Sequence, residues 1–352
     1  MAGCENKSLK DKVGDIIHQG VVGFSLSMAY ELGILEVLVL TDTPMTSQEV
    51  ADAKQLKERY VRELLKSLSC ANIVEVERVG DVYYYTIDKE KGSIFIGDSM
   101  PYLGFLASLS VRYEPMMKCI KKDGPYGLPY NETLTSMMTV NQVSSARSSI
   151  EISIMLDNVP GLKEKLETGI NVIELGSGMG SLISRMAQLF PASNFTASEY
   201  SSLNLEKGRE ALSSLNLTNL TMIQLDALNI PEDMYGKYDF AMTNDVIHDL
   251  PDPQRGLEQI RRLLRPGCYY AMIEIGLEDD VIQNIKTPGA DMVYTISAFH
   301  CVPQAYQDSN SVALGAGWGK GTAIRYSENA GYKVVSQHQH LDIFVVFVLQ
   351  VI

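Results

Sequence analysis

The pattern of hydrophobic and polar positions changes character at about Asn171. Before this point, apolar residues recur at the spacing of one helix face, as Tyr60, Leu64, Leu65 and Leu68 do. Beyond it, short apolar runs alternate with amphipathic stretches. The first pattern predicts a mainly helical domain. The second predicts strands joined by crossover helices, which is typical of a parallel α/β sheet.

The first hundred residues predict helices followed by a hairpin. Thr46 or Ser47 is suited to cap a helix that has Glu49 in its first turn. Gly80-Asp81 is suited to a tight turn between two strands. We expect helices over 13–38, from residue 46 or 47, and over 57–70, and strands over 72–79 and 82–87. This order of elements is typical of a winged-helix module.

Winged helices often bind DNA, so the charge of this segment matters. Residues 1–100 contain 11 Lys and Arg but 16 Asp and Glu, and the 57–70 helix mixes both signs. The whole chain carries a net charge of −13. Binding to nucleic acid or to an anionic membrane rests largely on Lys and Arg. We therefore expect neither partner, and we expect a dimerisation or lid role for the N-terminal domain.

The segment 101–165 is predicted to be mostly helical, with a break in the Pro- and Gly-rich run 124–129. Several methionines punctuate the segment, Met138 among them. Methionines at such positions usually fill a core, although they also form adaptable walls against flat ligands. We expect three parts: a winged-helix-like domain over 1–100, a helical linker or lid over 101–165 that contributes to the substrate pocket, and an α/β domain over 166–352.

The α/β domain ends differently from the way it begins. The last two predicted strands are separated by only a few residues around Leu341-Asp342, a connection that forces antiparallel pairing. We therefore predict a mostly parallel sheet with a C-terminal antiparallel hairpin. The predicted strands are 171–175, 194–198, 221–225, 240–243, 269–275, 334–339 and 343–351.

A glycine-rich loop directly follows the first strand of this domain. It runs Glu174-Leu175-Gly176-Ser177-Gly178-Met179-Gly180 and precedes a predicted helix. Glycines at such a turn allow a tight bend and let a ligand approach bare backbone. The spacing differs from the G-x-G-x-x-G fingerprint of dinucleotide enzymes, and no Gly-Lys-Ser/Thr follows as in nucleotide-triphosphate loops.

Acidic residues end the next two strands. Glu199, followed by Tyr200, is placed where a carboxylate accepts hydrogen bonds from ribose hydroxyls. Asp226, followed by Ala227, ends the third strand, where a carboxylate can meet an adenine amino group. Because ligands bind at the carboxyl ends of strands in open α/β sheets, these acids and the glycine loop predict a nucleoside site.

With these motifs, residues 165–352 resemble the class I S-adenosylmethionine-dependent methyltransferases. The resemblance implies a Rossmann-like sheet and S-adenosyl-L-methionine as the cofactor. It implies that the glycine loop contacts the methionyl part of the cofactor. The second-strand acid, Glu199, would hold the ribose, and the third-strand Asp226 would hold the adenine. Asn244 and Asp245, at the end of the fourth strand, would face the methionyl ammonium. The cofactor-binding residues would be Glu174, Gly176, Ser177, Gly178, Gly180, Glu199, Tyr200, Asp226, Ala227, Asn244 and Asp245.

The stretch Ile247-His248-Asp249-Leu250 resembles the I-L-H-D-W segment of small-molecule O-methyltransferases, which also carry an N-terminal winged-helix dimerisation domain. The resemblance implies a homodimer and a catalytic role for His248 as the general base on an acceptor hydroxyl. An imidazole is suited to take that proton near neutral pH. Asp249 or Glu274 would orient the ring or stabilise its charge. Leu250 departs from the pattern, which has Trp there.

The acceptor remains open at this stage. A His-Asp pair also follows the fourth strand in methyltransferases that act on carbon, nitrogen or arsenic, so an N-methyltransferase with a non-basic His248 is the alternative, followed by an inactive winged-helix regulator. Met138, Tyr294 and His300 are candidates for the substrate pocket. Asn244 and Asp245 have no second Asp/Asn pair to complete an oxygen-rich metal site, so we expect no metal.

The N-terminus has no apolar run of the kind that signal peptides carry, and the five cysteines lack metal-ligand spacing. The expected compartment is therefore the cytoplasm. The expected partners are a small-molecule substrate and a second copy of the chain.

Overall fold

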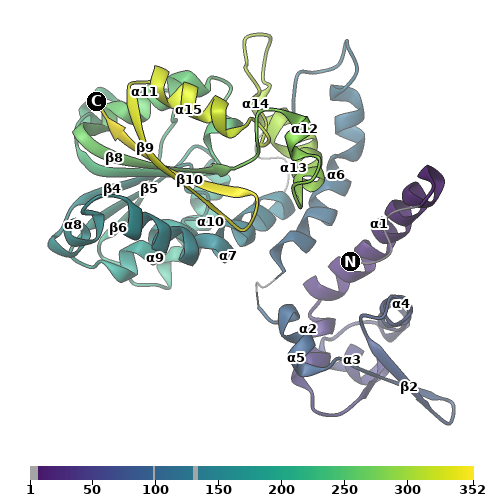
Figure 1. The fold of residues 1–352 in the computed structure, drawn as a ribbon. Helices are drawn as coiled ribbons and strands as arrows, with labels where there is room; N and C mark the ends of the chain where they lie inside the picture. Colours follow the sequence, from purple (N-terminus) through teal and green to yellow (C-terminus); the bar gives the residue numbers. More distant parts are fainter. Residues whose placement is uncertain (1–6, 98–99, 130–133) are drawn as a thin grey trace. The chain divides into compact units, whose positions relative to one another are not determined.

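The computed structural model describes residues 7–97, 100–129 and 134–352 (Figure 1). The chain divides into two compact units, residues 1–110 and residues 111–352. Among the described residues, each helix by itself is too short or too polar to cross a membrane. Only Leu9–Glu31 and Ile34–Leu40, taken together across a 65° bend, reach the necessary length and composition.

The N-terminal unit is a helical domain with a small three-stranded sheet. Its strands are β1 (Met45–Thr46), β2 (Glu75–Val79) and β3 (Val82–Thr86), in the order β1-β3-β2. Its helices are α1 (Leu9–Glu31), α2 (Ile34–Leu40), α3 (Ser47–Ala53), α4 (Glu58–Cys70) and α5 (Lys89–Gly92), with 3₁₀ turns at Ser93–Phe95 and Pro101–Leu103. The next helix, α6 (Gly104–Cys119), begins in this unit and ends in the second. The predicted winged-helix order is confirmed.

Local sequence explains most of these boundaries. Thr46 accepts a hydrogen bond from the backbone N–H of Glu49, whose side chain bonds back, which forms the capping box expected at the start of α3. The prediction of one helix over 13–38 was wrong. The chain breaks at Gly33, whose φ of 69° is left-handed, so α1 and α2 are separate helices.

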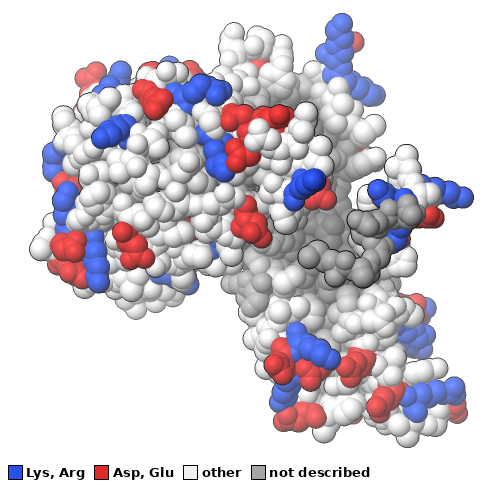
Figure 2. Space-filling view, in the orientation of Figure 1, with Lys and Arg blue, Asp and Glu red and all other residues white. Residues whose placement is uncertain are grey.

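One face of α1 is apolar and exposed. Ile16, Ile17 and Val21 are 70%, 62% and 66% exposed, and Leu9 and Phe24 extend the same apolar surface. On the view of Figure 2, Lys and Arg are interspersed with Asp and Glu over the N-terminal unit, without a continuous basic area. Large apolar side chains that stay in water are unusual in a monomer and are typical of an interaction surface.

The C-terminal unit is a seven-stranded sheet between two layers of helices (Figure 1). The helices are α7 (Leu134–Asn158), α8 (Leu162–Thr168), α9 (Ser181–Leu189), α10 (Ser202–Ser213), α11 (Pro253–Leu263), α12 (Val281–Asn284), α13 (Ala290–Ile296), α14 (Val302–Ala305) and α15 (Lys320–Asn329), with 3₁₀ turns at Glu232–Met234 and Ile247–Asp249 and a π-helical turn at Ser297–Cys301. The strands are β4 (Asn171–Leu175), β5 (Asn194–Glu199), β6 (Leu220–Gln224), β7 (Tyr238–Asn244), β8 (Leu264–Ile275), β9 (Tyr332–His340) and β10 (Phe344–Val351).

The strand order is β6-β5-β4-β7-β8-β10-β9. β4 to β8 are parallel, and β10 pairs antiparallel with both β8 and β9. The predicted mostly parallel sheet with a C-terminal antiparallel hairpin is therefore confirmed. Alternate residues of each strand point to opposite faces, so Val172 packs in the core under α7 to α10 while Ile173 packs under α11 and α15.

This order places a switch point at β4 and β7. β5 lies on one side of β4 and β7 on the other, so the connections that leave these strands run to opposite faces of the sheet. A crevice opens at such a point at the carboxyl ends of the strands. The glycine loop after β4 and the His-Asp turn after β7 therefore meet at one edge of the sheet.

Candidate active site

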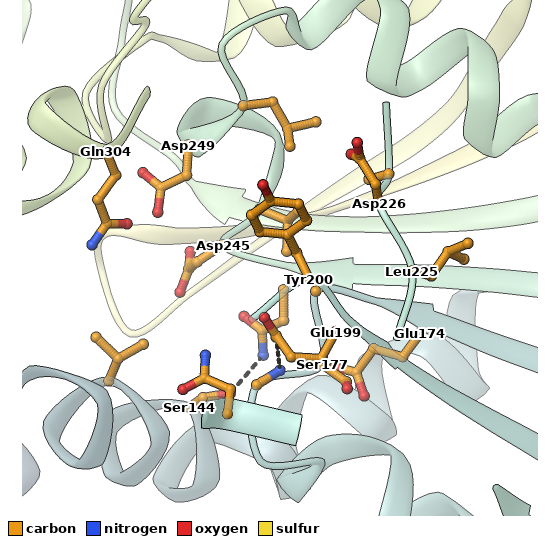
Figure 3. A pocket seen from close by; sticks show the side chains of 18 of the residues that line it. Ser144, Glu174, Ser177, Glu199, Tyr200, Leu225, Asp226, Asp245, Asp249 and Gln304 are labelled. Carbon is orange, nitrogen blue, oxygen red and sulfur yellow. Dashed lines mark hydrogen bonds between the residues drawn. The ribbon is translucent and has the colours of Figure 1, made fainter. Parts of the chain in front are cut away.

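A cavity of about 250 Å³ lies at this edge of the sheet. Its walls come from the segments that follow β4, β5, β6 and β7, from α7, and from the region of α14. Figure 3 shows Asp226 and Leu225 at one end, Asp249 and Gln304 at the other, and Tyr200 between them. The sequence predicted a ligand crevice at the strand ends, and the cavity is where that crevice was expected.

The glycine loop is shaped by backbone that only glycine adopts easily. Gly176, Gly178 and Gly180 have φ values of 63°, 56° and 81°. A Cβ on Gly176 would lie 2.6 Å from a methyl group of Val246, so this position is restricted by space as well as by φ. Gly176, Ser177 and Gly178 line the cavity, whereas Gly180 lies just outside its lining and begins α9.

Glu199 holds the glycine loop from the neighbouring strand. Its Oε2 accepts from the backbone N–H of Gly178 at 2.9 Å, and its Oε1 accepts from Ser201 at 2.8 Å. Burial raises the pKa of Glu199, and these two N–H groups oppose that shift. The predicted ribose acid therefore also fixes the backbone that lines the cavity.

Glu174 lies beneath the loop. Its carboxyl is 3% exposed and accepts from the backbone N–H of Ile183 at 3.2 Å, in the first turn of α9. Burial raises the pKa of Glu174 to about 8, so the group carries a proton at neutral pH. Its neutral carboxyl thus lines the cavity and holds the first turn of α9.

The far end of the cavity is formed by Tyr200, Asp226 and Ala227. Tyr200 is 61% exposed. Asp226 accepts from the backbone N–H of Leu228 and from the side chain of Asn229, which orient its carboxylate. All three are predicted cofactor residues, and all three line the cavity.

The opposite wall contains a buried charge cluster that sequence reasoning missed. Arg147 of α7 donates to Asp245 at 2.6 Å and to Asn244 at 2.8 Å, and its Nε lies 3.1 Å from Glu151. Asn244 also donates to Glu151 at 3.0 Å. Burial raises the pKa of Glu151 to about 7 against the charge of Arg147. The helical spacing of Arg147 and Glu151 was visible in the sequence, but their position against β7 was not.

His248 lies behind the cavity wall and is not among the residues that line it. Its ring is 2% exposed, Nδ1 bonds to Glu274, and Nε2 lies 3.3 Å from Asp249. Burial by itself lowers the pKa of His248, but the charges of Glu274 and Asp249 outweigh it and hold the pKa well above its usual value. The ring is therefore an imidazolium in this arrangement. Glu274 also accepts from the backbone N–H of Ile247 at 2.9 Å, which fixes it.

Asp249 is the member of this cluster that reaches the cavity. Burial raises its pKa to about 6, although the charge of His248 lowers it. Cys301 lies against this pair, and burial raises the pKa of its thiol to about 12. His248, Asp249 and Cys301 offer nitrogen, oxygen and sulfur atoms within 4.8 Å of one another, a set that can hold a metal ion.

His300 and Gln304 complete this end of the cavity. Burial lowers the pKa of His300 to about 3, assisted by the charges of Arg112 and His248, so the ring is neutral. Of the other two predicted substrate residues, Tyr294 packs in a separate core, where its hydroxyl accepts from Asn284. Met138 is 38% exposed. Neither is among the described residues that line the cavity.

Two family models match separate parts of the chain. Residues 166–325 match a model described as a methyltransferase domain, and residues 20–95 match one described as an Rv2258c-like winged HTH domain. The chain therefore carries a methyltransferase domain behind a winged-helix domain, as the sequence predicted.

Curated relatives match only part of the chain. It is 30% identical over 115 residues to a polyketide synthase-nonribosomal peptide synthetase of Phaeosphaeria nodorum, across 30% of this chain and 3% of that protein. It is also 30% identical over 115 residues to a tRNA (guanine-N(7)-)-methyltransferase of Staphylococcus haemolyticus, across 33% of this chain and 52% of that one. The chain thus spans a small fraction of the first relative and about half of the second.

Solved structures match along nearly the whole chain. Human N-acetylserotonin methyltransferase in complex with SAM has a TM-score of 0.70 at 16% identity, over 99% of both chains. The mitomycin 7-O-methyltransferase MmcR has a TM-score of 0.70 at 17% identity, over 97% of both. N,N-8-amino-8-demethyl-D-riboflavin dimethyltransferase from Streptomyces davawensis has a TM-score of 0.60 at 15% identity, over 98% of this chain and all of that one. The two-domain fold is shared with these structures.

Proposed function

Because residues 166–325 form a methyltransferase domain, we propose that this protein transfers the methyl group of S-adenosylmethionine to a hydroxyl of a small molecule. The observation that carries the proposal is the single cavity wall built from Gly176, Gly178, Glu199 and Asp226 at the carboxyl ends of adjacent strands. This wall offers bare backbone to the methionyl part and carboxylates to the ribose and adenine.

The donor would lie along the cavity with its adenine end at Asp226 and Tyr200 and its methionyl end at Asn244 and Asp245. Asp249 and Gln304 lie at the opposite end of the cavity from Asp226, where an acceptor would be held (Figure 3). Three of the solved structures with this fold hold SAM or SAH, which supports the assignment of the donor. The cavity, of about 250 Å³, is of the order of a small-molecule site.

Methyl transfer is an in-line displacement in which alignment of donor and acceptor supplies much of the rate. The acceptor oxygen forms a bond to the methyl carbon, the bond from carbon to sulfur breaks, and the hydroxyl proton must leave. Asp249 is the group of the His-Asp pair that lines the cavity, so we assign contact with this hydroxyl to Asp249. The proton passes to its carboxylate.

His248 retains a role in this step. Its Nε2 lies 3.3 Å from Asp249, and Glu274 holds its other nitrogen. As an imidazolium with both nitrogens against carboxylates, His248 cannot take up that proton itself. Its charge lowers the pKa of Asp249 and so keeps Asp249 available as the base.

An N-methyltransferase is the second candidate. It is favoured by the position of His248 behind the cavity wall, because a neutral amine needs no base to be activated. One solved structure with this fold is described as an N,N-dimethyltransferase, which shows that the fold occurs with that activity.

Replacing His248 with Ala tests the role of the pair. For a hydroxyl acceptor, we expect kcat to fall by about 100-fold to 10,000-fold, the usual contribution of a general base, while the Kd for S-adenosylmethionine changes little. A loss below tenfold with the donor still bound would favour the amine acceptor. Calorimetry with ligand-free protein that shows no binding of S-adenosylmethionine or S-adenosylhomocysteine would exclude the proposed function itself.

We also propose a homodimer formed through the N-terminal unit. The exposed apolar face of α1, which includes Ile16, Ile17 and Val21, supports this assignment because burial of such a face on a second copy removes it from water. The predicted parts 1–100, 101–165 and 166–352 belong to the same proposal, with α7 of the middle part supplying Asn141 and Ser144 to the cavity.

A further inference from the structure

The acceptor end of the cavity carries an oxygen that no described group of the protein uses. Gln304, on α14, is 3% exposed and lines the cavity. Its Nε2 lies 3.2 Å and 3.3 Å from the two ring nitrogens of His300, which holds the amide against the imidazole. Its Oε1 is buried and has no hydrogen-bond partner within the described part of the chain. Buried carbonyl oxygens are rarely left unpaired, because their desolvation is unfavourable.

The backbone that carries Gln304 is held in place by neighbouring segments. The π-helical turn Ser297–Cys301 leads directly into α14, and such turns are frequent at functional sites. The Pro- and Gly-rich segment around Gly127 packs on the backbone of α14. Leu128 donates to the carbonyl of Pro303 at 2.9 Å, and a Cβ on Gly127 would lie 2.0 Å from that same oxygen. The amide is thus presented to the cavity by a supported element.

The charged side chains that line the cavity beside this oxygen are carboxylates, whereas the cations Arg112 and His248 lie behind the lining. Asp249 and Asp245 line the cavity beside Oε1, whereas Lys and Arg are absent from the described lining. Arg147 lies behind the wall and is engaged by Asp245 and Glu151. His300 is neutral. The groups that an acceptor would contact directly at this end are therefore carboxylates and lone pairs, which favour a hydrogen-bond donor on the acceptor.

We propose that the acceptor carries a hydrogen-bond donor next to the methylated atom, and that Gln304 Oε1 accepts from this donor. The neighbouring hydroxyl of a vicinal diol or a catechol and the amine of an amino alcohol or an aminophenol have this chemistry. The proposal rests on the proposed methyl transfer in the same cavity. Asp249 and Gln304 lie at the same end of the cavity (Figure 3). In this proposal Asp249 contacts the group that is methylated, and Gln304 contacts the neighbouring donor.

The test uses the full chain and labelled S-adenosylmethionine with four matched probes. Catechol and 2-aminophenol carry a donor beside the hydroxyl, 2-methoxyphenol carries only acceptors there, and 2-hydroxybenzoate carries an anion. We expect the two donor probes to be methylated with a kcat/KM at least about tenfold above that of the other two probes. A probe without a donor leaves the buried Oε1 of Gln304 without a hydrogen bond, which weakens its binding. Mass spectrometry locates the added methyl.

Gln304→Leu removes the oxygen at similar volume. We expect it to lower kcat/KM for the donor probes by about 10-fold to 100-fold and to erase their advantage, with the Kd for S-adenosylmethionine unchanged. Gln304→Glu keeps an acceptor oxygen and should retain the order of the probes, which a merely structural role would not predict. Gln254→Leu, on α11 outside the cavity lining, is the matched control and should alter none of these values.

Three results would overturn this inference. They are methylation of 2-hydroxybenzoate or 2-methoxyphenol as efficient as that of catechol, an unchanged order of probes in Gln304→Leu, and methylation of none of the probes while S-adenosylmethionine still binds. Each of these leaves the donor site standing. Absence of donor binding would instead defeat the proposed function.

Discussion

Arg147 is the residue whose replacement tests the cavity wall most directly. Its side chain is 3% exposed and contacts Glu151, which is fully buried, and Asp245, which is 26% exposed. Its guanidinium lies 3.7 Å from the centre of the Phe344 ring. Arg147→Met keeps a flexible apolar side chain against that ring but removes the positive charge. Two acidic groups then share a buried wall without a cation.

The expected magnitude follows from this burial. Removing one partner of a buried ion pair costs about 3–5 kcal/mol, because the remaining charge is uncompensated. A domain of this size loses about 2–4 °C of Tm for each kcal/mol, so we expect a fall of about 6–20 °C. Part of the penalty is avoided because Glu151, with a pKa of about 7, can take up a proton. The lower half of that range is therefore expected at pH 6 and the upper half at pH 8.

Thermal unfolding followed by circular dichroism measures the effect. The control is Arg185→Met on α9, whose guanidinium donates to the hydroxyl of Ser148 at 2.8 Å, so that only neutral partners are lost. A neutral hydrogen bond contributes about 1 kcal/mol, so this variant should lose only a few degrees. In the double variant Arg147→Met/Glu151→Gln, we expect more than half of the lost Tm to return, since the buried carboxyl is gone.

Two outcomes would refute this reasoning. One is an Arg147→Met variant no less stable than Arg185→Met. The other is a double variant whose two effects simply add, because residues of one charge network should couple by at least about 0.5 kcal/mol. A parallel measurement of the Kd for S-adenosylmethionine should show weaker binding in Arg147→Met, since Asn244 and Asp245 lose the donor that orients them.

Three further predictions concern the loop, a buried acid and the helix α1. Gly176→Ala should weaken binding of S-adenosylmethionine by more than tenfold in calorimetry, because its φ is left-handed and its Cβ would lie 2.6 Å from a methyl group of Val246. Unchanged affinity would show that the loop does not bind the donor. The folded-state pKa of Glu174 is raised from 4.5 to about 8, so its contribution to stability is full below pH 4.5 and declines as pH rises toward 8. In Glu174→Gln, the free energy of urea unfolding should therefore fall less between pH 5 and pH 8 than it does in the original protein. An identical pH dependence in both proteins would contradict the raised pKa of Glu174. Ile17→Asp should convert a dimer into a monomer in sedimentation experiments, with Lys10→Asp on the same helix as control; equal mass for both variants would reject α1 as the interface.

The architecture could be predicted from the amino-acid sequence because local chemistry and periodicity agree with the fold. Glycines at Gly176 and Gly178 require positive φ, Thr46 and Glu49 form a cap from adjacent residues, and the connection at Leu341-Asp342 is too short for a parallel return. Each of these depends on neighbours in the chain. Strand bounds shifted by only a few residues, since ends depend on the register of partner strands as well as on the chain itself.

The arrangement of side chains at the acceptor end could not be predicted in this way, because it depends on packing between distant segments. The sequence placed His248 next to Asp249, but only the packing of the turn after β7 put the ring behind the wall and the carboxylate in the cavity. Arg147 and Gln304 lie roughly 100 and 55 residues from that turn along the chain, so no local pattern connects them to it. Their roles follow from burial and from the charges that meet them there, and these are properties of the packed domain.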